Sequence, residues 1–278
     1  MRRAFPQVWE RRVCRLLEVP RSALRRAPAE QRLRRPLDET LVERVRELIA
    51  KHPTYGYRKL WALLRHGDGL VVNKKAIYRF LATKRWFVHE RSVTPRPRVQ
   101  GRTSVAAASN RRWAIDLTHV FCGADGWGLL AAVIDCHDRA IVGYEFSLRG
   151  RAREAERALE DACLCSGFDT LRPKDVTPTV RSDNGLVFTA RRFRAARRDY
   201  RLGQEFITPC APQQNGLIER FFSSVNEDCV RQHNFVSFAD ARATIGQWIR
   251  FYNERGPHQA LGYLSPHQYR AQQLQAVP

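Results

Sequence analysis

Three short stretches decide the fold of this 278-residue chain: Trp113-Ala-Ile-Asp-Leu-Thr118, Arg181-Ser-Asp-Asn-Gly185 and Pro212-Gln-Gln-Asn-Gly-Leu-Ile-Glu-Arg220. Each contains one carboxylate: Asp116, Asp183 and Glu219. The last two are separated by 35 residues, and an Asn-Gly pair stands beside both. Two Asp and one Glu in this setting indicate a carboxylate cage for divalent metal ions in an enzyme that processes DNA.

The rhythm of apolar residues around these stretches predicts an α/β domain. Strands are expected at residues 113–120, 128–135, 141–148, 179–182 and 205–208, and helices at 153–165, 190–200 and about 213–229. Asp116 would then lie in mid-strand, Asp183 at a strand end, and Glu219 in the first turns of a helix. The three carboxylates can converge only if the strands that carry Asp116 and Asp183 pair in one sheet.

The chemistry of phosphodiester cleavage suits such a cage. Two Mg²⁺ ions roughly 3.5–4 Å apart, held by carboxylates, activate the attacking oxygen and stabilise the leaving one. Chance is the alternative, because residues 113–232 contain 17 acidic side chains. Asp135 and Asp138 are interpreted as turn residues, and Glu145 is expected to face solvent.

Charge is unevenly distributed along the chain. Residues 1–112 contain 28 basic and 9 acidic residues, whereas residues 113–232 contain 16 and 17, within a total formal charge of +20. A basic module that binds a polyanion, joined to a module that uses metal, is the simplest interpretation. A solvated, arginine-rich surface would not explain such sharp segregation.

The basic part contains a predicted helix-turn-helix. Apolar residues at helical spacing predict three helices between residues 38 and 83, with Asp38 and Asn73 as N-caps of the first and third. A structural three-helix bundle is the alternative. The exposed face of the last helix would read DNA through Lys74, Lys75, Tyr78 and Arg79.

We therefore expect five segments in the chain. They are a basic helical segment at 1–36, a helix-turn-helix domain at 37–83, a basic linker at 84–111, a catalytic core at 112–232, and a C-terminal helix with a tail that packs on the core at 233–278.

Composition argues against several other classes. The apolar stretches are too short to span a bilayer, and no apolar segment follows Arg2 and Arg3 as in a secretory signal. The seven cysteines lack zinc-site spacing, so reduced thiols are expected. These features favour a cytoplasmic protein with no membrane partner.

Longer motifs give the chain a family resemblance. They are Trp113-Ala-Ile-Asp116, Ser182-Asp-Asn-Gly185-Leu-Val-Phe188, Pro212 through Phe221, and Phe251-Tyr-Asn253 with Pro257-His-Gln-Ala-Leu-Gly-Tyr263. Upstream, Tyr55-Gly-Tyr57-Arg58 and Val72 through Arg79 complete the pattern. With these motifs the chain resembles bacterial insertion-sequence transposases of the second-reading-frame (OrfB) type, which have a retroviral-integrase-like core.

The resemblance implies an RNase-H-like fold and a DDE polynucleotidyl transferase with Asp116, Asp183 and Glu219 as catalytic metal ligands. It implies two Mg²⁺ or Mn²⁺ ions, strand cleavage by water at element ends, and strand transfer by a 3′-hydroxyl. Terminal inverted repeats and target DNA would be the partners, bound by a homo-oligomer, with fusion to or association with an upstream-frame product. Further candidate DNA contacts are Arg58, Lys59, Asn215 and Asn226.

One departure from the pattern concerns the helix that carries Glu219. Related chains commonly have basic residues where this chain has Ser223 and Asn226, and a position seven residues after Glu219 shares its face. The alternatives are therefore a weakened or decayed copy that acts only as a DNA-binding protein, and a nuclease on the same fold that only hydrolyses.

Overall fold

The computed structural model describes residues 10–16, 18, 20, 38–88, 106–148, 152–168, 176–208 and 211–275. The chain divides into two units, residues 1–44 and 45–278. The first unit contains α1 (Glu10–Leu16), which confirms a short helix in the basic segment, and the beginning of α3 (Glu39–Lys51). Residues 21–37 and residues 89–105 of the predicted linker lie outside the described residues.

Three helices form the predicted helix-turn-helix. They are α3, α4 (Tyr57–Ala62), which runs on into the π-helical turn η1 (Leu63–Gly67), and α5 (Lys74–Lys84). The predicted apolar positions Leu60, Leu64 and Ile77 are buried, so the spacing argument is confirmed. The predicted cap is also present, because the side chain of Asn73 accepts a hydrogen bond of 2.8 Å from the backbone N–H of Lys75.

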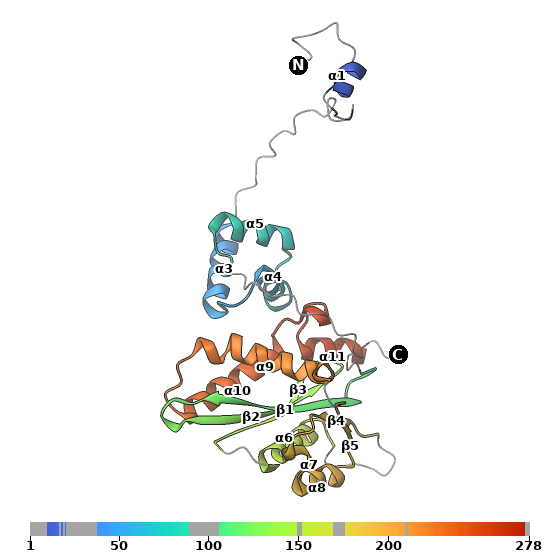
Figure 1. Cartoon of the computed structure of the whole chain (residues 1–278). Coiled ribbons are helices and arrows are strands. Elements are labelled where there is room, and N and C mark those ends of the chain that lie inside the picture. Colours follow the sequence, from blue (N-terminus) through green and yellow to red (C-terminus); the bar gives the residue numbers. More distant parts are fainter. Residues whose placement is uncertain are drawn as a thin grey trace. The chain divides into compact units, whose positions relative to one another are not determined.

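A five-stranded mixed sheet forms the centre of the core, in the order β3-β2-β1-β4-β5 (Figure 1). The strands are β1 (Arg112–Phe121), β2 (Trp127–Asp135), β3 (Ile141–Ser147), β4 (Thr179–Ser182) and β5 (Gly203–Phe206). The first three are antiparallel neighbours, whereas β4 pairs in parallel with both β1 and β5. This is the predicted RNase-H-like fold, and the required pairing between the strands of Asp116 and Asp183 is confirmed.

Helices cover both faces of the sheet (Figure 1). On one face α6 (Ala152–Cys165), α7 (Leu186–Thr189) and α8 (Arg191–Asp199) pack over a cluster that includes Trp113 and Ile115. On the other face α9 (Gly216–Asp228) and α10 (Phe238–Glu254) pack over a cluster that includes Ala114 and Val120. The alternation of neighbouring β1 residues between the two clusters follows from the two-residue period of a strand.

Several boundaries differ from the sequence predictions. The fifth strand was expected at 205–208 but lies at Gly203–Phe206, because its register is set by pairing Thr179 with Gly203. The helix expected from about 213 begins at Gly216, after a 3-10 turn at Pro212–Asn215. A further helix, α11 (Pro266–Gln275), follows α10 within the segment predicted to carry a C-terminal helix and tail.

Two acidic turn residues have a structural role. Asp135 is the last residue of β2 and Asp138 lies in the turn that follows, and both are completely buried. Arg270 of α11 donates to Asp138 across 2.6 Å, and Ser109 donates to the same carboxylate. Glu145 was predicted to face solvent, but its side chain is only partly exposed and forms an ion pair of 3.4 Å with Arg157. The segmental boundaries at 36, 83, 111 and 232 stay predictions.

Candidate active site

Asp116 occupies the middle of β1, opposite Ala132 of β2. Its Oδ1 accepts a hydrogen bond of 2.8 Å from the backbone N–H of Leu117, and its Oδ2 lies 3.4 Å from Nδ2 of Asn215. Burial raises the pKa of Asp116 to about 6; the Leu117 N–H opposes this shift, and the charges of Asp183 and Glu219 add to it. A half-buried carboxylate close to two others is a group that a bound cation would stabilise.

Asp183 directly follows β4, the parallel neighbour of β1. Its Oδ1 accepts a hydrogen bond of 2.9 Å from the backbone N–H of Gly185, which is the local turn typical of Asp followed by Asn-Gly. A Cβ atom at position 185 would lie 2.8 Å from that same Oδ1, so the turn fits closely around the carboxylate only with glycine. Asn184 extends the loop toward β5 by donating to the carbonyl of Ile207 at 3.1 Å.

Glu219 lies in the first turn of α9. This helix is fixed on the sheet by its buried residues, among them Ile218 and Phe222, and it packs against β1 and β2. Glu219 as a whole is exposed, but the protein covers part of its carboxyl group, and this partial loss of solvent raises its pKa. The chain therefore brings a strand middle, a strand end and a helix start to one region of the core.

The carboxylates are near one another without forming ligand geometry. In the described part of the chain, no three His, Cys, Asp or Glu side chains are arranged closely enough to hold a metal ion. The donor set nevertheless fits a hard divalent cation, because Oδ1 of Asn215 is a buried oxygen with no hydrogen-bond partner among the described residues.

Arg181 is a residue that the sequence interpretation missed. It is buried in β4, donates from Nη1 to the carbonyl of Gln214 at 3.0 Å, and pairs through Nη2 with Glu205 at 2.8 Å. The guanidinium thus ties β4 and β5 to the turn that precedes α9. A lone arginine in a short apolar strand two residues before Asp183 was the available signal.

Asn215, predicted as a DNA contact, is buried, with its amide beside Asp116. This placement favours orientation of the carboxylate over contact with DNA. Asn226 is half-buried on α9. Ser223 is exposed, but its hydroxyl donates to the carbonyl of Glu219 at 3.0 Å.

The predicted DNA-reading residues are divided by the structure. On α5, Lys75, Tyr78 and Arg79 are exposed. The ammonium of Lys74 instead lies over two aromatic rings, 4.2 Å from the centroid of Trp61 and 4.6 Å from that of Tyr263.

The two candidates of α4 also differ from each other. Arg58 is exposed, and its Nε donates to the hydroxyl of Tyr57 at 3.1 Å. Lys59 is half-buried and forms an ion pair of 3.1 Å with Asp228 of α9. The charges of Lys59 and Lys74 are therefore used within the protein.

Comparisons with known proteins agree with this architecture. The family described as "Integrase core domain" matches residues 106–212, a second model of that description matches residues 200–266, and "HTH-like domain" matches residues 36–85. The described helices include none long and apolar enough to cross a membrane.

Curated relatives extend over nearly the whole chain. A protein of insertion element IS476 from Xanthomonas euvesicatoria is 34% identical over 97% of this chain and 76% of its own length. The InsD transposase of insertion element IS2 from Escherichia coli is 28% identical over 87% of this chain and 82% of its own length. Among solved structures, the HTLV-2 integrase catalytic core in complex with magnesium is similar, with 16% identity, 61% of this chain and 99% of that chain covered, and a TM-score of 0.44.

Proposed function

Because this chain belongs to the insertion-element transposases of the second-reading-frame type, with an HTH-like domain and an integrase core, we propose that it cuts DNA at the ends of its element and joins them to a target. The observation that carries the proposal is Asp116, a half-buried carboxylate whose pKa is raised by burial and by the nearby charges of Asp183 and Glu219.

We further propose that Asp116, Asp183 and Glu219 hold two Mg²⁺ or Mn²⁺ ions. The bound ions would supply activation of the attacking oxygen and stabilisation of the leaving oxygen. The protein's own part is positioning. Asn215 orients Asp116 through its amide, and the Gly185 N–H fixes the Asp183 carboxylate. Arg181 keeps the turn before α9 in contact with the strand that leads to Asp183.

DNA recognition is proposed for α5, with Lys75 and Arg79 as its cationic readers because both are exposed. The basic residues 1–112 would add phosphate contacts, which predicts a steep salt dependence. Terminal inverted repeats and target DNA are the proposed partners, with action as a homo-oligomer and fusion to or association with an upstream-frame product.

The Asp116→Asn variant tests this function. Incubated with Mg²⁺ and labelled duplexes carrying the element's terminal repeats, it should lose cleavage by more than about 100-fold, since even partners of metal ligands contribute about 10–100-fold. Binding to the same duplex should be retained, because the substitution removes a negative charge. The matched control is Asp199→Asn, which changes an exposed aspartate at the end of α8.

The outcomes separate the alternatives. Cleavage that persists in Asp116→Asn rejects the assignment. Wild-type protein that binds the repeats but never cleaves them favours the decayed copy, for which Ser223 is the supporting observation, since its hydroxyl bonds back to Glu219 and adds no cation to this face of α9. Cleavage without joined products favours the hydrolytic nuclease.

A further inference from the structure

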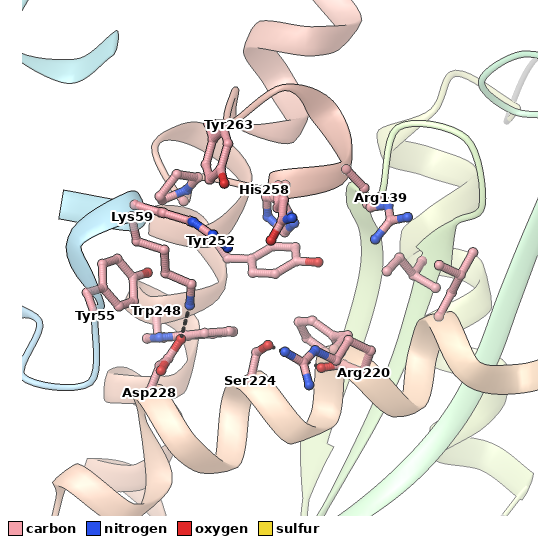
Figure 2. A pocket seen from close by; sticks show the side chains of 18 residues that line it. Tyr55, Lys59, Arg139, Arg220, Ser224, Asp228, Trp248, Tyr252, His258 and Tyr263 are labelled. Carbon is pink, nitrogen blue, oxygen red and sulfur yellow. Dashed lines mark hydrogen bonds and ion pairs between the residues drawn. The ribbon is translucent and has the colours of Figure 1, made fainter. Parts of the chain in front are cut away.

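A cavity of about 520 Å³ lies beside α9, along a face of the helix that runs from Leu217 to Asp228 and does not include Glu219. Its other walls come from α4, α10 and the segment 256–263 (Figure 2). We call it the basic pocket. Its volume is within the range that holds small molecules or single groups of a larger ligand. None of the residues in the proposed metal site lines it.

One side of the basic pocket is cationic. Figure 2 shows Arg139, from the turn between β2 and β3, and Arg220, from α9, on the same side of the cavity. Neither guanidinium has a carboxylate partner among the residues described. The one acid in the lining, Asp228, is already matched, because Lys59 lies 3.1 Å from its Oδ2 and Thr54 donates to its Oδ1 at 2.6 Å. Two guanidinium groups without acidic partners suit a phosphate.

Aromatic side chains form another part of the wall. Trp248 of α10 and Tyr263 on the opposite rim are half-buried, whereas Tyr252, with its ring centroid 5.4 Å from that of Trp248, is buried (Figure 2). Flat aromatic side chains beside a phosphate site are the elements that single-stranded nucleic acid uses, because any base can stack on them. A plain phosphate would need no aromatic wall, and a purely apolar ligand would leave both arginines unmatched.

We propose that the basic pocket binds one unpaired nucleotide of the DNA strand being processed, with its phosphate on Arg139 and Arg220 and its base against the aromatic wall. This inference rests on the proposed function, since Arg220 directly follows Glu219 on α9. Successive residues of a helix point roughly 100° apart, so a strand that leaves the metal site would reach the Arg220 face of α9 by passing around the helix. The walls from α4 and α9 let the same nucleotide contact the helix-turn-helix and the catalytic core together.

The test compares three DNA duplexes that are identical except at one end. One end is fully paired, one carries a single unpaired 5′ nucleotide with the fluorescent base 2-aminopurine, and one carries an abasic nucleotide there. Full-length wild-type protein should bind the 2-aminopurine end roughly tenfold more tightly than the paired end. Its fluorescence should fall as the base stacks. Equal affinity for the 2-aminopurine and paired ends, or for the 2-aminopurine and abasic ends, overturns the proposal.

Substitutions locate the effect. Arg220→Gln should abolish the preference for the unpaired nucleotide, whereas Arg198→Gln, a matched exposed arginine on α8, should keep it. Arg139 has a backbone φ of 64°, a conformation that asparagine tolerates, so Arg139→Asn gives a second variant with little strain. A preference that survives in both pocket variants overturns the proposal.

Two further arms separate related explanations. If free deoxyadenosine monophosphate displaces the unpaired end at micromolar concentration, the ligand is a free nucleotide and the strand assignment is wrong. Binding is measured without metal, so it does not depend on cleavage. If the protein cleaves DNA but shows no preference for the unpaired end, the proposed function stands and nucleotide binding in the basic pocket is rejected. If it prefers the unpaired end but does not cleave, nucleotide binding stands and the proposed function is rejected.

Discussion

The contact around Asp228 allows a sharp prediction about how the helix-turn-helix is attached to the core. Asp228 is the last residue of α9, and its side chain is only 9% exposed. Its carboxylate accepts a hydrogen bond of 2.6 Å from the Thr54 hydroxyl and forms an ion pair of 3.1 Å with the Lys59 ammonium. Next to it, His52 stacks on Phe251 of α10 with ring centroids 4.7 Å apart. We expect the Asp228→Asn variant to loosen this attachment without unfolding the core.

The magnitude follows from the two bonds. A hydrogen bond to a charged group contributes roughly 1.5–3 kcal/mol, but asparagine can still accept from Thr54, so most of that contribution is retained. The ion pair is worth about 0–1 kcal/mol, because the Lys59 side chain is 38% exposed and is screened by solvent. If the asparagine oxygen accepts from Thr54, its NH2 group points toward the Lys59 ammonium, and this contact is lost because both groups are donors. The expected loss of unfolding free energy is therefore about 1 kcal/mol.

A double-mutant cycle measures the pairwise part. Urea unfolding of wild type, Asp228→Asn, Lys59→Met and the double variant should give a coupling energy of about 0.5–1 kcal/mol that shrinks in 1 M NaCl. Limited proteolysis should cut Asp228→Asn faster within residues 45–88 than wild type. Asp199→Asn, a remote exposed aspartate, is the charge-matched control. If the effects of the two substitutions are additive and proteolysis is unchanged, the contact between Asp228 and Lys59 does not attach the helix-turn-helix to the core.

Two other predictions concern the C-terminal segment and the catalytic loop. Burial lowers the pKa of His258 to about 3, aided by Arg139 and Lys59, so the folded protein keeps this ring neutral. The unfolded chain binds a proton near pH 6.5. Unfolding free energy should therefore fall as pH drops below 6.5, by roughly 2–3 kcal/mol at pH 4.5, and His258→Gln should lack this part of the slope in urea titrations at several pH values. Gly185→Ala should reduce cleavage because its Cβ would lie 2.8 Å from Asp183 Oδ1, while Gly216→Ala, with no heavy atom within 4 Å of the new Cβ, should keep it; equal activities would show that the carboxylate adapts.

Local pattern was sufficient for much of the fold. Long apolar runs with clear ends predicted β1 and β2 to within a residue or so, and helical spacing predicted the buried faces of the helix-turn-helix. That Asp116 and Asp183 lie in one region was also predictable, because it depends on the pairing of β1 with β4, whereas the place of Glu219 depends on how α9 packs on β1 and β2. Their individual roles stay predictions.

Features set by tertiary contacts could not be derived in the same way. The fifth strand was predicted at 205–208, two residues after its observed position. A strand of four mixed polar and apolar residues fits more than one register, and only pairing with β4 selects the observed one. Lys59 and Lys74 were predicted as DNA contacts from their charge, and that role stays a prediction; the sequence did not show their partners within the protein. Their partners, Asp228 and Tyr263, are distant in sequence, so no local pattern links them.

These contacts give α9 a mechanical role. Glu219 lies in its first turn and Asp228 at its end, nine residues apart, or about 13 Å at ~1.5 Å per residue. Buried side chains such as Phe221 and Val225 hold the helix on the sheet between those two points. If the helix-turn-helix binds DNA and Glu219 is catalytic, as proposed, a shift of the helix-turn-helix acts on the same helix that carries Glu219. The distance between the recognised sequence and the cleaved bond would then be set by α9, and loosening at Asp228 should blur the cleavage position before it lowers the rate.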